Sequence, residues 1–172
     1  MPVHIHTIDA SSNDHGQLAR ARNIHRNAIL TNCVLDVVTG IIQRVGDSRI
    51  DRLDIIGHGH PGQLNVGGGT CPQAHQVIAV NDDGRLFNRN ILALLAGRFA
   101  ENAVVRLHAC RLAQGWKGEA LLYQLAELWR IRVQGALVTQ FPDRHDRFEG
   151  RNYTEANGAE GNLEPLATRQ NH

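Results

Sequence analysis

The alternation of apolar and polar residues divides the chain into segments with strand and helix periodicity. Residues 2–8 alternate with a period of two, which predicts a β-strand. Residues 17–45 change to a period near 3.6, which predicts helix, and the half after Thr31 has the stronger apolar face. Asn32 is a suitable N-cap for this second half. The arginine-rich half before Thr31 fits either a separate helix or a loop.

The centre of the chain alternates between the two kinds of pattern. Apolar runs over residues 50–56, 103–109 and 131–138 predict three strands. A helical pattern over residues 88–100 lies between the first two runs, and another over residues 119–128 lies between the last two. Residues 63–69 and 76–80 predict the two arms of a hairpin. This order predicts an α/β fold, with a mostly parallel sheet covered by helices on both faces.

The chain is expected to form a single domain over residues 1–156. It has 172 residues, of which 42% are hydrophobic and 20% charged, a composition typical of a globular protein. No internal repeat and no linker divides it. Residues 148–153 predict a last short strand, and residues 157–172, rich in Asn, Gly and Glu, predict a mobile C-terminal tail.

Charge and composition exclude several classes of protein. The net charge is +1 and no long basic run occurs, which argues against nucleic acid as the main partner. Polar residues interrupt the longest apolar region, residues 28–42, so no membrane span is expected. The N-terminus lacks the pattern of a secretory signal, and the three scattered cysteines do not predict a disulfide framework. We therefore expect a cytoplasmic protein, although export by a route without a signal peptide fits the same sequence.

The strongest candidate for chemistry is a pair of residues that follow two predicted strands. His58 ends the apolar run 53–56 and is flanked by glycines, and Cys110 ends the run 103–109. Active sites of open α/β sheets form at the carboxyl ends of strands. A thiol with a pKa near ~8.5 is only slightly ionised at neutral pH, and a neighbouring imidazole can take its proton. The backbone N–H groups of Gly59 and Cys110 are the expected oxyanion hole for attack on an acyl carbon.

The His58-Gly59 and Ala109-Cys110 blocks, each after an apolar run and 52 residues apart, resemble the caspase–gingipain clan (clan CD) of cysteine peptidases. The similarity covers residues 50–140 and is nearest to the self-processing protease domains of bacterial toxins and to CHAT-type domains. It implies a three-layer caspase-like sandwich. It also implies a cysteine endopeptidase, self-processing or regulated, that acts on a protein or peptide substrate without a cofactor. His58 is then the general base and Cys110 the nucleophile; Asp54 lies too early in its strand to be assumed as a third member.

Two features depart from this pattern. Arg106 and His108 lie in a strand that is expected to be apolar on both faces, which predicts either an edge strand or a polar cleft. His60 is a competing base.

The function also has an alternative outside the enzymes. A caspase-like fold with an inert Cys110 would instead be a binding or scaffold module.

A metal-dependent hydrolase is a further alternative. His4 and His6 form one His-x-His pair, and His58 and His60 form another. Imidazole binds zinc well, but no carboxylate follows His60, as a metallo-hydrolase would be expected to supply. His4 and His6 also fit one exposed face of a strand, and the cysteine dyad remains the preferred interpretation.

Overall fold

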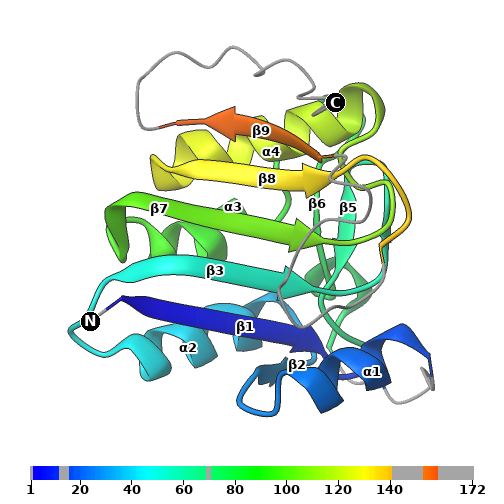
Figure 1. Cartoon of the computed structure of the whole chain (residues 1–172). Coiled ribbons are helices and arrows are strands. Elements are labelled where there is room, and N and C mark those ends of the chain that lie inside the picture. The colour runs from blue at the N-terminus through cyan, green and yellow to red at the C-terminus, as the bar shows by residue number, and fades with distance from the viewer. Residues whose placement is uncertain (1, 12–15, 69–70, 141–152, 159–172) are drawn as a thin grey trace, which may run out of the picture.

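A central, mainly parallel sheet organises the chain (Figure 1). The computed structural model describes residues 2–11, 16–68, 71–140 and 153–158. In these residues the sheet has six strands, five of them parallel, and the last is antiparallel to its neighbour. Their order across the sheet is β2 (Ile29–Thr31), β1 (Val3–Asp9), β3 (Ile50–Ile56), β7 (Phe99–His108), β8 (Arg132–Ala136) and β9 (Tyr153–Asn157).

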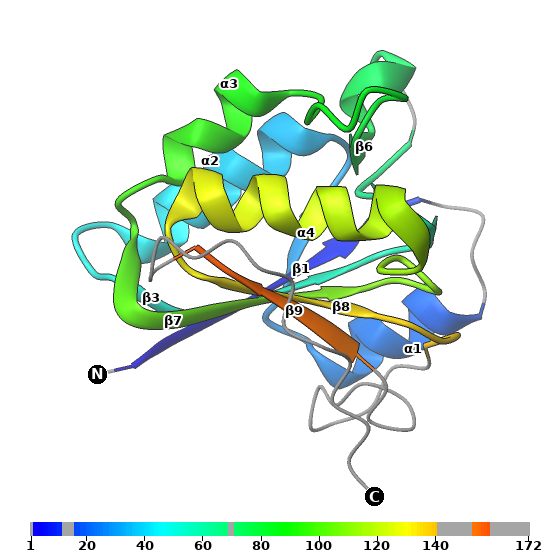
Figure 2. The same cartoon turned by 90° about the horizontal axis from the view of Figure 1, so that it is seen from above.

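Helices cover the two faces of the sheet unequally (Figure 2). One face carries α2 (Val34–Val45), α3 (Arg89–Leu92) with the short 3₁₀ helix η2 (Ala93–Leu95), and α4 (Gly115–Trp129). The opposite face carries α1 (Gln17–Ile24), which lies near the carboxyl end of β1. The predicted α/β class, with helices on both faces of a mostly parallel sheet, is therefore confirmed.

The main core lies on one face of the sheet, between its strands and the helices α2 and α4. Side chains alternate along a strand, so Leu53 and Ile55 of β3 and Val105 and Leu107 of β7 all point to this face, where they are buried. A smaller core joins α1 to the other face through Ile8, Leu18, Ala21 and Ile56. Two apolar clusters of unequal size thus fix the sheet between its helices.

A second, smaller sheet follows β3. It contains β4 (Gly59–His60), β5 (Gln63–Asn65) and β6 (Val77–Ala79), all antiparallel, and the 3₁₀ helix η1 (Gln73–His75) precedes β6. The pairing of β5 with β6 confirms the predicted hairpin. The two-residue strand β4 was not predicted, because a strand this short has no periodicity of its own.

Two predicted helical regions differ in part from the structure. In the region 17–45 the arginine-rich half forms a separate helix, α1, which confirms one of the two predicted alternatives, but the short strand β2 follows it and Cys33, not Asn32, is the N-cap of α2. The Asp36 carboxylate accepts the N–H of Asn32, the residue before this N-cap, at 2.9 Å. The helix predicted to reach residue 100 ends at Leu95. Gly97, with a φ of 76°, turns the chain into β7, which already begins at Phe99.

The last strand of the sheet is also displaced along the chain from its predicted position. β9 begins at Tyr153, the last residue of the segment predicted as a strand, and continues to Asn157. The rest of that segment, residues 148–152, and most of the predicted tail, residues 159–172, lie outside the described residues.

Candidate functional site

His58 and Cys110 follow two strands that are direct neighbours in the sheet. The last pair in the register of β3 with β7 is Ile56 with His108, and the Gly57 N–H donates to the His108 carbonyl at 3.1 Å. Each candidate residue lies two positions beyond that pair, at the carboxyl edge of the sheet. His58 is exposed and Cys110 is half-buried. The expected adjacency of the two strand ends is confirmed, while the catalytic roles of the two side chains stay predictions.

The Cys110 thiol lies where the ends of β7 and β8 meet. Its sulfur accepts the N–H of Gln140 at 3.5 Å, and the N–H of Arg111 donates to the Val138 carbonyl at 3.1 Å. Arg111 has a φ of 53°, the left-handed region, so the chain turns sharply directly after the cysteine. This turn directs the chain into α4 and leaves the thiol half-buried against the segment after β8.

Gly59 occupies a position where a side chain has no room. A Cβ there would lie 2.5 Å from the Gln63 carbonyl oxygen and 2.7 Å from the Ala109 Cβ. The small sheet is therefore packed directly against the residue before Cys110. This close approach requires glycine for a reason separate from the predicted role of its N–H in an oxyanion hole.

The competing base, His60, lies on β4 and pairs with Gln63 of the hairpin. Its side chain is exposed. His58 precedes β4, and its carbonyl accepts the Asn65 N–H at 2.8 Å. His58 is thus the histidine nearer in the chain to the end of β3.

A row of polar side chains crosses the face of the sheet opposite α2 and α4. These residues alternate with the buried apolar residues of the main core on the three central strands, and they are His4, His6, Arg52, Asp54, Arg106 and His108. The strand with Arg106 and His108 lies between β3 and β8, so the prediction of an edge strand was wrong. Polar side chains do line one face of this interior strand, and the predicted cleft along it stays a prediction.

Asp54 is the centre of this polar row. Its side chain is fully buried, and His4 Nε2 lies 2.5 Å from Oδ2 while His108 Nε2 lies 2.6 Å from Oδ1. Arg52 donates to both oxygens, at 2.7 Å from Nε and 3.1 Å from Nη2. Burial alone raises the pKa of Asp54, but the hydrogen bonds of His108, His4 and Arg52 outweigh it and hold that pKa well below its usual range. Asp54 is therefore a buried carboxylate that stays ionised.

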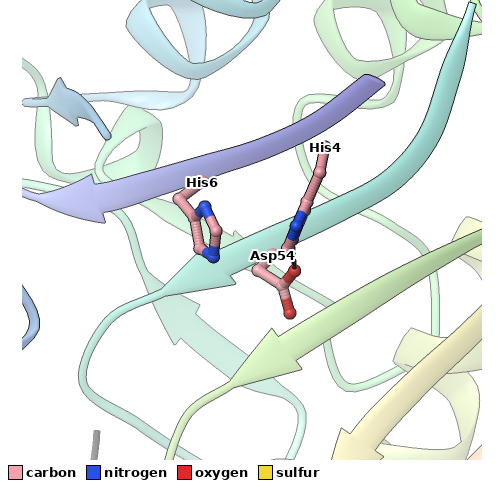
Figure 3. Close-up of side chains that lie close together, drawn as sticks. All are labelled: His4, His6 and Asp54. Atoms are coloured by element: carbon pink, nitrogen blue, oxygen red, sulfur yellow. Dashed lines mark hydrogen bonds and ion pairs between the residues drawn. The ribbon is translucent and has the colours of Figure 1, made fainter. Parts of the chain in front are cut away.

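His4, His6 and Asp54 form a compact group with the side-chain types that bind metals (Figure 3). One ring nitrogen of each histidine and one Asp54 oxygen lie within 4.8 Å of one another. The rings of His4 and His6 are 4.3 Å apart between centroids, and His25 stacks on His6 at 4.1 Å. Within the described part of the chain this is the group that could hold a metal ion, and His58 and His60 are not part of it.

Sequence reasoning missed the role of Asp54. His6 and Asp54 are 48 residues apart in the chain, and they meet because the β1–β3 register pairs them directly. The signal available in the sequence was a single acidic residue between Leu53 and Ile55, in a run that is otherwise apolar. A charge inside a buried strand is costly without partners, so such a residue indicates a polar network.

The other two cysteines lie apart from Cys110 in the chain and contact each other. Cys33 is buried at the start of α2, and Cys71 is half-buried. The hydrogen bond with Cys33 is the largest of the effects that raise the pKa of Cys71, to about 11. Cys71 is consequently a weakly ionised thiol, which does not favour it as a nucleophile.

The fold and site define an α/β protein with a mainly parallel sheet, a polar network on one face and a histidine and a cysteine at neighbouring strand ends. The chain belongs to a family described as a domain of unknown function, DUF4347, whose model matches residues 5–137. The match runs from β1 to just beyond β8 and includes His58, Cys110 and Asp54. No curated protein and no solved structure matches the chain. No helix in the described ranges has the length and apolar character needed to cross a membrane.

Proposed function

We propose that the chain is a cysteine endopeptidase of caspase-like fold, with Cys110 as nucleophile and His58 as general base. The observation that carries this proposal is the register that pairs Ile56 with His108. Because both strands run in the same direction, the residues two positions further on emerge at one edge of the sheet, from adjacent strands. Open α/β sheets form their sites at that edge.

The chemistry follows from these two groups. The His58 imidazole takes the proton from the Cys110 thiol, and the thiolate attacks the carbonyl carbon of the substrate peptide. The N–H groups of Gly59 and Cys110 donate to the oxyanion of the tetrahedral intermediate, and one such donor accounts for about 10²–10³-fold in rate in other enzymes. The imidazolium then gives its proton to the leaving amine, and water hydrolyses the acyl-enzyme, which restores the thiol.

The surroundings of Cys110 support a substrate site at this position. Cys110 is half-buried between the ends of β7 and β8, at the edge of the sheet where a substrate peptide would approach it. The Gly59–Ala109 contact brings the backbone after His58 against the residue before the nucleophile. Both predicted oxyanion donors therefore belong to segments that are packed together.

An electrophilic peptide probe tests the proposal. A set of acyloxymethyl ketone peptides with acidic, basic and apolar P1 residues is incubated with the purified chain, and the adduct is located by intact-mass and peptide mass spectrometry. We expect one adduct, on Cys110, that is lost in Cys110→Ala. We expect at least a tenfold slower reaction in His58→Ala, since an activating base contributes about 10²–10⁴-fold.

The matched controls are His60→Ala and Cys71→Ala, which are expected to label at the rate of the unmodified chain. Loss of labelling in His60→Ala with full labelling in His58→Ala would assign the base to His60 and contradict the dyad. An adduct on Cys71, or no adduct with any probe at neutral pH, would favour the alternative function, a non-catalytic binding or scaffold module.

A further inference from the structure

A second candidate site lies on the polar face of the sheet, on β1 and β3. His6 and Asp54 are direct partners in the β1–β3 register, and His4 precedes His6 by two residues on the same face. Figure 3 shows both imidazole rings turned toward the Asp54 carboxylate. Because adjacent strands of a sheet hold these three residues, the positions of their Cα atoms are fixed by backbone pairing and do not depend on a loop.

We propose that His4, His6 and Asp54 bind a divalent transition-metal ion of the kind represented by Zn²⁺. Two imidazoles and one carboxylate are a donor set that zinc and its neighbours in the first transition row accept. With three protein ligands, a fourth position is left for water or another ligand. The proposal does not depend on the dyad, because none of its three residues belongs to that pair.

The present distances are close to those that such an ion requires. Zinc bonds to nitrogen and oxygen of about 2.0–2.2 Å in a tetrahedron separate the ligand atoms by about 3.4 Å. The three ligand atoms now lie within 4.8 Å of one another, and the closest pair, His4 Nε2 and Asp54 Oδ2, is 2.5 Å apart. The ion therefore replaces the His4–Asp54 hydrogen bond. These two atoms move apart by about 0.9 Å, a change within reach of side-chain rotations.

His108 provides the support that metal-bound carboxylates usually have. His108 Nε2 lies 2.6 Å from Oδ1, the Asp54 oxygen that does not contact His4. The His108 side chain is only 10% exposed. Outer hydrogen bonds of this kind hold a ligand in orientation, and their loss commonly lowers metal affinity by about 10–100-fold. Arg52 also donates to both oxygens, but its positive charge opposes that of a bound dication.

The test is direct titration of the chain with Zn²⁺. The protein is purified without a histidine tag, stripped with a chelator, and titrated by calorimetry, with equilibrium dialysis and elemental analysis to give the stoichiometry. We expect one ion per chain, and a loss of affinity of at least tenfold in both His4→Gln and His6→Gln. Titration with Co²⁺ supplies a second readout, because the visible absorption of the bound ion reports four-coordinate geometry.

Two control variants locate the ion. His60→Gln removes a histidine of the other His-x-His pair, and Cys110→Ala removes a thiol at the end of β7; both are expected to bind Zn²⁺ as the unmodified chain does. Circular dichroism of His4→Gln and His6→Gln verifies that these variants are folded. Absence of stoichiometric binding, or binding that survives in folded His6→Gln and is lost in His60→Gln, overturns the assignment. Neither result bears on labelling of Cys110, so the metal site and the peptidase proposal fail separately.

Discussion

His108 Nε2 lies 2.6 Å from Oδ1 of Asp54, and this contact joins two central strands of the sheet on the face opposite α2 and α4. His108 is two residues before Cys110, and Asp54 is four residues before His58. The two residues of this contact therefore lie on the same two strands as the proposed dyad, only a few positions before it. A change at Asp54 is expected to affect the stability of the sheet and the site at its edge.

Replacement of Asp54 by Asn is expected to destabilise the metal-free protein by about 3–5 kcal/mol. The buried carboxylate accepts hydrogen bonds from His4, His108 and Arg52, and the variant leaves these groups without their anionic partner. Urea unfolding followed by circular dichroism measures the loss. The control is Asp82→Asn, which breaks an exposed ion pair with Lys117 and is expected to leave the unfolding midpoint unchanged. Equal effects of the two variants would contradict a structural role for the Asp54 network.

Replacement of Gly59 by Ala is expected to destabilise the protein by about 1–3 kcal/mol, because the added Cβ meets the Gln63 carbonyl oxygen and the Ala109 Cβ at 2.5 and 2.7 Å. The clash separates the small sheet from the residue before Cys110, so labelling of Cys110 by the peptide probe is expected to slow as well. Gly68→Ala is the control, since its Cβ would meet only the Ser11 hydroxyl, at 3.3 Å. Unfolding midpoints that agree between the two variants would contradict the close packing at Gly59.

Alkylation rates are expected to distinguish Cys71 from an ordinary exposed thiol. A pKa raised from 9.0 to about 11 reduces the thiolate fraction at pH 7.5 by about 100-fold, and the greater nucleophilicity of the more basic thiolate recovers about tenfold of this. Iodoacetamide is therefore expected to react about tenfold more slowly with Cys71 than with a model thiol of pKa 9.0. The rate is expected to rise in Cys33→Ser, which removes the neighbouring thiol. A Cys71 rate that does not change in Cys33→Ser would contradict the thiol–thiol contact.

The charge of Arg52 is expected to weaken metal binding. Its guanidinium lies 2.7 Å from the Asp54 oxygen that also contacts His4, and it repels a dication held by the same carboxylate. Arg52→Gln keeps a hydrogen-bond donor for Asp54 and removes the positive charge. We therefore expect this variant to bind Zn²⁺ more tightly, by a few-fold, in calorimetric titration. A weaker affinity in a folded Arg52→Gln protein would show that the hydrogen bonds of Arg52 to Asp54 outweigh its charge, and would contradict this prediction.

The hydrophobic pattern alone predicted the elements whose periodicity is strong. β1, β3 and α2 have apolar residues at strand or helix spacing over seven residues or more, so local sequence decides their conformation. The pattern also predicted the α/β class and the parallel sheet, since alternating strands and helices have few other ways to pack. The positions of His58 and Cys110 after their strands followed from the same reasoning.

Elements that depend on their neighbours were not predictable in this way. The strands β2 and β4 have three and two residues, and they exist because β1 and β5 offer them backbone partners. The first two residues of β7, Phe99 and Ala100, continue a helical pattern in the sequence, but Gly97 and the pairing of Phe99 with Ile50 draw them into the sheet. Pairing between residues distant in the chain overrides local preference at such positions.

The sequence by itself determined which residue types are present: a His-x-His pair on the first strand, an aspartate in an apolar run, and a histidine and a cysteine after two strands. Only the tertiary structure decided that Asp54 meets His4, His6 and His108, because that contact depends on the order β1-β3-β7 and on the register of each pair. A shift of one residue in the β1–β3 register would turn His4 and His6 to the face opposite Asp54, and the same shift in the β3–β7 register would turn His108 away from it. The polar network is thus a property of strand pairing, which no local pattern encodes.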